Sequence, residues 1–242
     1  MAEGSGDTMR RTTAGIALAG ALLLALTGCA GGGGTVGEVS TPKPIPTLTP
    51  TAAAPEAPVA AAQLGEPELA AVFTGIQFVP DQYASIQEML DSIYPGLTAT
   101  DASCLSPFGL GWDTASPGST VQYGTSNDRS MTSVVASAAD PAAASALVAE
   151  AKGALERCAS GSALFAMEGV PVQTTVAQTV PTTTGTDESV GWTVTGAVGS
   201  SPFTLVGITA RVGGNVVALV GWDPATNASY VPQATQMFVD AL

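Results

Sequence analysis

Residues 140–158, DPAAASALVAEAKGALERC, predict a long helix that ends at a cysteine. Asp140 is a residue type that often caps the N-terminus of a helix, and Pro141 suits the first helical position. Apolar residues then recur at helical spacing, so we expect one side of this helix to be buried. That side carries Ala144, Leu147, Val148, Ala151, Leu155 and Cys158.

The sequence on both sides of this helix alternates between apolar and polar or small residues, which is the pattern of half-buried strands. Gly213 and Gly214 stand between two such segments and predict a tight hairpin. Short turns between neighbouring strands indicate an antiparallel sheet. The alternating apolar residues are Val121 and Tyr123, then Val190, Trp192 and Val194, then Phe203 and Leu205, and finally Val217 and Leu219.

Two further helices are expected, one in residues 80–96 and one at the end of the chain. We therefore predict an α+β fold, in which an antiparallel β-sheet has helices packed on one face. The helical stripes are Tyr83, Ile86, Leu90 and Ile93 in the first of these helices, and Val231, Ala234, Met237, Phe238 and Ala241 in the second.

The N-terminal region has the order of a secretion signal. Arg10 and Arg11 precede an apolar run over residues 14–26, which as a helix would be about 20 Å long and too short to span a bilayer core of about 30 Å. The residues Leu26-Thr27-Gly28-Cys29 resemble the lipobox of bacterial lipoproteins. We predict a signal peptide over residues 1–28 and lipid attachment at Cys29, which would hold the protein on the extracytoplasmic face of the cell membrane. A plain secretion signal with an incidental cysteine is the alternative.

Residues 29–66 are expected to hold the lipid anchor and a disordered linker. Gly, Pro, Thr and Ala dominate this segment and no apolar period runs through it. Residues 67–242 are then long enough for one domain of ordinary size.

The chain has three cysteines. If Cys29 carries lipid, Cys104 and Cys158 remain as a pair, and an exported chain with two remaining cysteines favours a disulfide between them. Two buried free thiols are the alternative.

The charge balance excludes some classes of function. The chain has 7 basic and 20 acidic residues, a formal net charge of −13, and no histidine. An acidic chain is a poor partner for nucleic acid, because binding to phosphates depends on Lys and Arg. The absence of histidine removes the commonest general base and the imidazole metal ligands. We therefore expect no enzyme activity, no metal and no cofactor.

Several of these features together resemble the PknH-like extracellular sensor domain family of mycobacteria and related actinobacteria. The family occurs on a receptor-type serine/threonine kinase and in many stand-alone lipoproteins. The resemblance covers about residues 100–242 and includes a cysteine before the first strand pair, the helix of residues 140–158 with its terminal cysteine, and the late hairpin ARVGGNVVALV over residues 210–220. It implies a sensor or ligand-binding domain over residues 67–242, without catalysis, whose cleft takes an unknown small-molecule or protein ligand.

The tryptophans are the candidate ligand-binding residues, with core packing as the alternative for each. They are Trp112, Trp192 and Trp222.

Two other functions stay open at this point. One is an envelope hydrolase that uses carboxylates, for which Asp101, Asp113 and Asp128 are the candidates, and the other is a structural or partner-binding lipoprotein without a small ligand.

Overall fold

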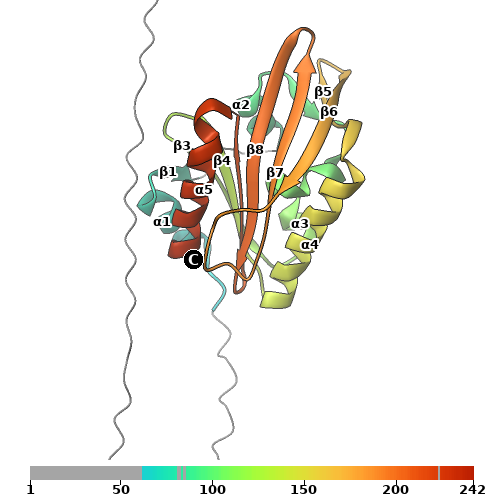
Figure 1. Ribbon diagram of the computed structural model, residues 1–242. Helices are drawn as coiled ribbons and strands as arrows, with labels where there is room; N and C mark the ends of the chain where they lie inside the picture. Colours follow the sequence, from blue (N-terminus) through green and yellow to red (C-terminus); the bar gives the residue numbers. More distant parts are fainter. Residues whose placement is uncertain (1–61, 81–82, 84–85, 223) are drawn as a thin grey trace, which may run out of the picture. The chain divides into compact units, whose positions relative to one another are not determined.

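The computed structural model describes residues 62–242 except 81–82, 84–85 and 223 (Figure 1). The predicted signal peptide, Cys29 and the linker up to residue 61 lie outside the described residues. Of the helices in the described part of the chain, none is long and apolar enough to cross a membrane.

Nine strands of the described residues form one sheet in the order β1-β3-β4-β9-β8-β7-β6-β5-β2, and every neighbouring pair is antiparallel. The α+β fold with an antiparallel sheet is therefore confirmed. The strands are β1 (Phe78–Pro80), β2 (Leu97–Ala99), β3 (Thr120–Ser126), β4 (Met131–Ser137), β5 (Ser160–Met167), β6 (Val170–Thr179), β7 (Glu188–Val198), β8 (Ser201–Val212) and β9 (Asn215–Gly221). The helices are α1 (Glu66–Gly75), α2 (Ile86–Ile93), the 3-10 helix η1 (Ala102–Phe108), α3 (Trp112–Ala115), α4 (Pro141–Arg157) and α5 (Pro224–Ala241).

Helix α4 forms as predicted. The Asp140 side chain accepts a hydrogen bond from the Ala143 backbone N–H at 2.8 Å, which satisfies one of the free donors at the helix start. The predicted stripe is buried against the sheet, and Cys158 is the C-cap residue.

The helices cover both faces of the sheet, which corrects the prediction of one covered face (Figure 1). On one face, α4, η1 and α3 pack in a core that includes Val134 and Ala218. On the other, α1 and α5 pack in a separate core that includes Val135 and Leu219. The reason lies in β4 and β9, because both strands are apolar at consecutive positions and so present apolar side chains to both faces.

The stripe predicted for the last helix needs a smaller correction. Val231, Ala234 and Phe238 are buried in the core beneath α5, as expected, but Met237 and Ala241 are exposed. Thr235 and Val239 are buried in their place, so the buried face is turned by part of a helical turn from the predicted one.

The disulfide between Cys104 and Cys158 is confirmed. Both residues are buried, and their Cα atoms lie 5.9 Å apart. The bond joins η1 to the C-terminal end of α4 across 54 residues of sequence, so it ties together two elements that cover the same face of the sheet.

A charged cluster fastens α4 to the sheet. Glu188 of β7 accepts hydrogen bonds from the Ser145 hydroxyl of α4 at 2.6 Å and from Arg211 Nε of β8 at 2.9 Å. The bond from Ser145, followed by the contact with Arg211, lowers the pKa of Glu188. The carboxylate is therefore held in its charged form by one partner from helix α4 and one from the sheet.

Candidate functional site

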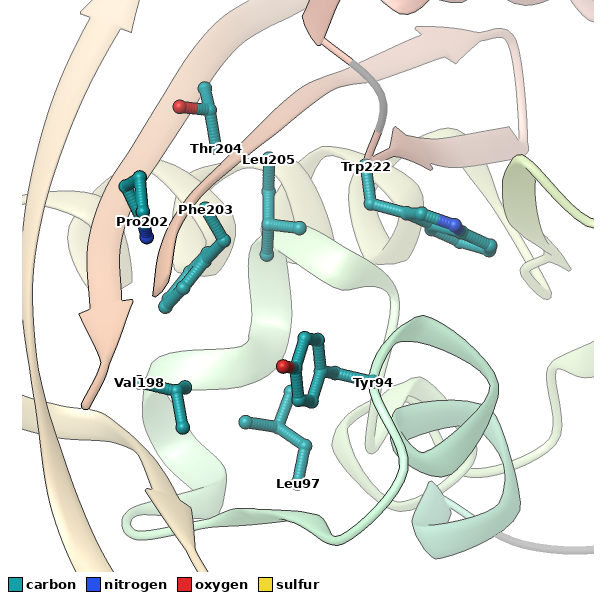
Figure 2. A pocket seen from close by; sticks show the side chains of 8 residues that line it. All are labelled: Tyr94, Leu97, Val198, Pro202, Phe203, Thr204, Leu205 and Trp222. Carbon is teal, nitrogen blue, oxygen red and sulfur yellow. The ribbon is translucent and has the colours of Figure 1, made fainter. Parts of the chain in front are cut away.

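A cavity of about 440 Å³ lies at one end of the sheet, on the face that carries η1 and α4 (Figure 2). Three separate parts of the chain form it: the segment from α2 to β2, the tip of the β7–β8 hairpin, and the residue after β9. The lining residues are Tyr94, Leu97, Val198, Pro202, Phe203, Thr204, Leu205 and Trp222.

Strand register places the hairpin side chains in the cavity wall. Leu205 pairs with Val194 and Phe203 pairs with Gly196, and paired residues of antiparallel strands point to the same face. A Cβ atom on Gly196 would lie only 2.7 Å from the ring of Phe203, so the ring lies across the space that a side chain at 196 would need. Glycine at this position is therefore required for the observed position of Phe203.

Hydrogen bonds between two side chains of α2 and the backbone hold the segment that carries Tyr94 and Leu97. Asp91 Oδ1 accepts from the Gly96 N–H at 3.0 Å, and Gln87 Nε2 donates to the Leu97 carbonyl at 2.8 Å. Gly96 has a φ of 83°, a left-handed conformation that favours glycine. Figure 2 shows the Tyr94 ring between Leu205 and Leu97, with its hydroxyl directed toward the side lined by Val198 and Phe203.

Trp222 forms another part of the wall. Its backbone N–H donates to the Ser130 carbonyl at 3.4 Å, and Asn227 Nδ2 of α5 donates to the same oxygen at 3.0 Å. The Trp222 side chain is half-buried and packs against the core on the α4 face. One aromatic wall of the cavity is thus tied to the β3–β4 turn and to α5.

The structure separates the three tryptophans. Trp222 lines the cavity, whereas Trp112 and Trp192 are fully buried in the core and have no exposed surface to offer a ligand. The Trp192 ring packs against Phe108, with 4.6 Å between the ring centroids. A role of any tryptophan in ligand binding stays a prediction, and the location of Trp222 is the one compatible with it.

The three candidate carboxylates lie on different elements. Asp101 caps η1 and accepts from the backbone N–H and hydroxyl of Ser103, and these hydrogen bonds lower its pKa. Asp128 lies in the β3–β4 turn, and hydrogen bonds from Ser126 and Ser130 lower its pKa as well. Asp113 is exposed on α3. Asp101 and Asp128 thus stabilise a helix start and a turn, while a general acid would need a raised pKa.

The described residues form no cluster of metal ligands, and the cavity lining is uncharged. Among the described residues, no group of three or more histidine, cysteine, aspartate or glutamate side chains is placed to hold a metal ion. The residues that line the cavity include no acidic or basic side chain. The arrangement is therefore suited to enclosing an apolar molecule, with a few polar atoms at its edge.

The buried Tyr123 of β3 is expected to make the fold less stable at alkaline pH. Burial, and then the negative charge of Asp113, raises the pKa of Tyr123 to about 12. Between about pH 10 and pH 12 the unfolded chain loses a proton that the folded protein keeps, so we expect the free energy of unfolding to fall as pH rises through this window. Urea unfolding of wild type and Tyr123→Phe tests this. The variant should lose less stability between about pH 9 and pH 11, and parallel losses would contradict the assignment.

Of the residues that line the cavity, the sequence marks Trp222 alone as a candidate binding residue. Phe203 and Leu205 are predicted as strand residues, and Tyr94 lies in the helix expected within residues 80–96, but no sequence signal joins these segments to each other.

No protein-family model matches this chain, and a search of the curated proteins finds no match. Among solved structures, the crystal structure of the extracellular domain of PknH from Mycobacterium tuberculosis is similar, with a TM-score of 0.45 and 13% sequence identity. The similarity covers 74% of this chain and 93% of that chain.

Proposed function

We propose that this chain is a lipoprotein on the extracytoplasmic face of the cell membrane, and that its domain binds a small apolar ligand without catalysing a reaction. The observation that carries the proposal is the cavity of about 440 Å³ at the tip of the β7–β8 hairpin. Its size falls in the range of about 300–1,000 Å³ that is typical of small-molecule sites, and its walls are mainly aliphatic and aromatic side chains.

The carboxylate hydrolase is the weaker alternative. Asp101 and Asp128 already accept hydrogen bonds that favour their charged forms, and none of the three candidate carboxylates lines the cavity. A structural lipoprotein without a small ligand would have no need of an apolar hollow beside the exposed Tyr94 ring, because filling the hollow with side chains would add stability.

The binding proposal can be tested with a neutral fluorescent probe, N-phenyl-1-naphthylamine, titrated into the full chain carrying Cys29→Ala so that no acyl chain competes. We expect Tyr94→Ala to weaken binding about 3- to 30-fold, because truncating a contact aromatic removes apolar contact area. Probe fluorescence against protein concentration gives the dissociation constant.

Tyr230→Ala is the matched control. Tyr230 lies on α5 and lines another hollow, of about 410 Å³, together with Met237 and Ile76. It is 51% exposed, against 41% for Tyr94, so the two substitutions remove similar amounts of exposed aromatic surface. Loss of binding in Tyr230→Ala with none in Tyr94→Ala would place the ligand at α5, and absence of binding in the parent Cys29→Ala chain would refute the proposal.

The lipid anchor needs a separate experiment, because Cys29 lies outside the described residues. With Cys29→Ala we expect the protein to move from the membrane fraction to the soluble extracytoplasmic fraction, since attached acyl chains contribute about 0.8 kcal/mol per buried methylene. Fractionation and immunoblotting of producing cells measure this. Cys104→Ala is the control, which should not change the fraction, and retention of the Cys29 variant in the membrane would exclude the anchor.

A further inference from the structure

The cavity contains polar atoms but no group that could neutralise a charged ligand. The polar atoms of its lining side chains are the Tyr94 and Thr204 hydroxyl oxygens and the indole Nε1 of Trp222. None of the lining residues is Lys, Arg, Asp or Glu. Any charge that a ligand carried into the cavity would therefore lose water without gaining an ionic partner.

A charged group beside the cavity, Asp91, is an acid. Asp91 of α2 accepts a hydrogen bond from the Gly96 N–H at 3.0 Å, in the turn between the lining residues Tyr94 and Leu97. Asp91 is exposed, and the whole chain carries a formal net charge of −13. An anionic ligand would therefore meet a negative charge at this wall, while a neutral ligand would not.

The cost of placing an unpaired anion in an apolar site is large compared with the apolar contacts of one small ligand. From the uncharged lining and the position of Asp91, we propose that this cavity selects neutral apolar ligands over anionic molecules of the same skeleton. This inference rests on the proposed function, because it names the chemical class of ligand for the same cavity.

Two probes of one skeleton test the selectivity. N-phenyl-1-naphthylamine is neutral, and 1-anilinonaphthalene-8-sulfonate is the same molecule with one sulfonate group added. We expect the full Cys29→Ala chain to bind the neutral probe about tenfold more tightly or better at low ionic strength, a difference of about 1.4 kcal/mol. Equal or tighter binding of the sulfonate would overturn the selectivity but leave the proposed function intact. Binding of neither probe would instead overturn the proposed function.

A pair of charge variants tests the part played by Asp91. Asp91→Asn removes the charge and keeps an oxygen that can accept from Gly96, so the turn is preserved. The control is Asp240→Asn near the C-terminus of α5, a helix of 18 residues, or about 27 Å, that begins two residues after Trp222. We expect Asp91→Asn to tighten sulfonate binding about 2- to 5-fold and to leave the neutral probe unchanged, with the gain reduced by added salt. Equal effects of the two variants on the sulfonate would overturn the role of Asp91.

Discussion

Replacing Trp192 by alanine is expected to lower the free energy of unfolding by about 3–5 kcal/mol. Trp192 has no exposed surface and packs against Phe108 of η1, in the core that α4 covers. Truncation would remove a large buried ring and leave a hollow that the surrounding helices and strands can fill only in part. A loss of this size is a large fraction of the total stability of a typical domain, which is about 5–15 kcal/mol.

The contact between Trp192 and Gly207 gives a sharper form of this prediction. Gly207 of β8 pairs directly with Trp192 of β7, and a Cβ atom on Gly207 would lie 2.1 Å from Cζ2 of the indole. The ring therefore lies flat across the glycine. We expect Gly207→Ala alone to cost about 1–3 kcal/mol, because the indole has to leave its place in a packed core.

The same substitution should cost much less when the indole is gone. In the Trp192→Ala background, Gly207→Ala meets no ring, and alanine is intrinsically better than glycine inside a strand by about 0.5–1 kcal/mol. Urea unfolding followed by circular dichroism gives the four free energies of this double-mutant cycle. Equal costs of Gly207→Ala in the two backgrounds would contradict the packing. Trp222→Ala serves as a comparison with a smaller expected loss, because that side chain is half-buried.

The elements that could be predicted are those with strong local signals. Helix α4 has a capping aspartate, a proline at its first position and a complete apolar stripe, and the structure contains each of these. The β8–β9 hairpin has two glycines at its turn, and Gly213 adopts a φ of 58° there. In both cases the local preference and the tertiary packing agree, so a short stretch of sequence is sufficient to predict the element.

Helix α1 shows why other elements were missed. It follows directly on a Pro- and Ala-rich segment, and its buried face consists of only Leu69 and Phe73. Its start does carry a signal, because Glu68 reaches back to accept from the Gly65 N–H at 3.1 Å. The helix is stabilised by tertiary contacts, since the Phe73 ring packs against Phe78 of β1 and against Phe238 of α5. Of these two partners, Phe238 lies far away in the sequence.

The cavity could not be predicted for a related reason. Its walls come from three segments that sequence analysis treats separately, and the hollow exists because the side chains of these segments stop short of one another. Periodicity identifies which residues face a core, as it did for Leu205, but it does not show where that core is left unfilled. The same holds for Trp222, because an indole at a strand end is compatible both with ligand binding and with a filled core.

Removing the disulfide should cause the second large loss of stability. In the chain-entropy account, a bond that closes a loop of 54 residues stabilises a fold by about 4 kcal/mol, and loss of native disulfides from small exported domains costs about 2–5 kcal/mol. We expect Cys104→Ala/Cys158→Ala to lower the free energy of unfolding by an amount in this range. Alanine is preferred to serine here because both cysteines are buried and a hydroxyl would lack a partner.

Reduction of the wild-type protein separates the effect of the bond from the effect of the lost sulfur atoms. Urea unfolding with and without a reductant should show that wild type falls to nearly the stability of the double variant, while the variant itself does not respond to the reductant. The remaining gap measures the packing of the two thiols between η1 and the end of α4. If wild type were as stable reduced as oxidised, the helix contacts alone would hold these elements, and the bond would contribute nothing to folding.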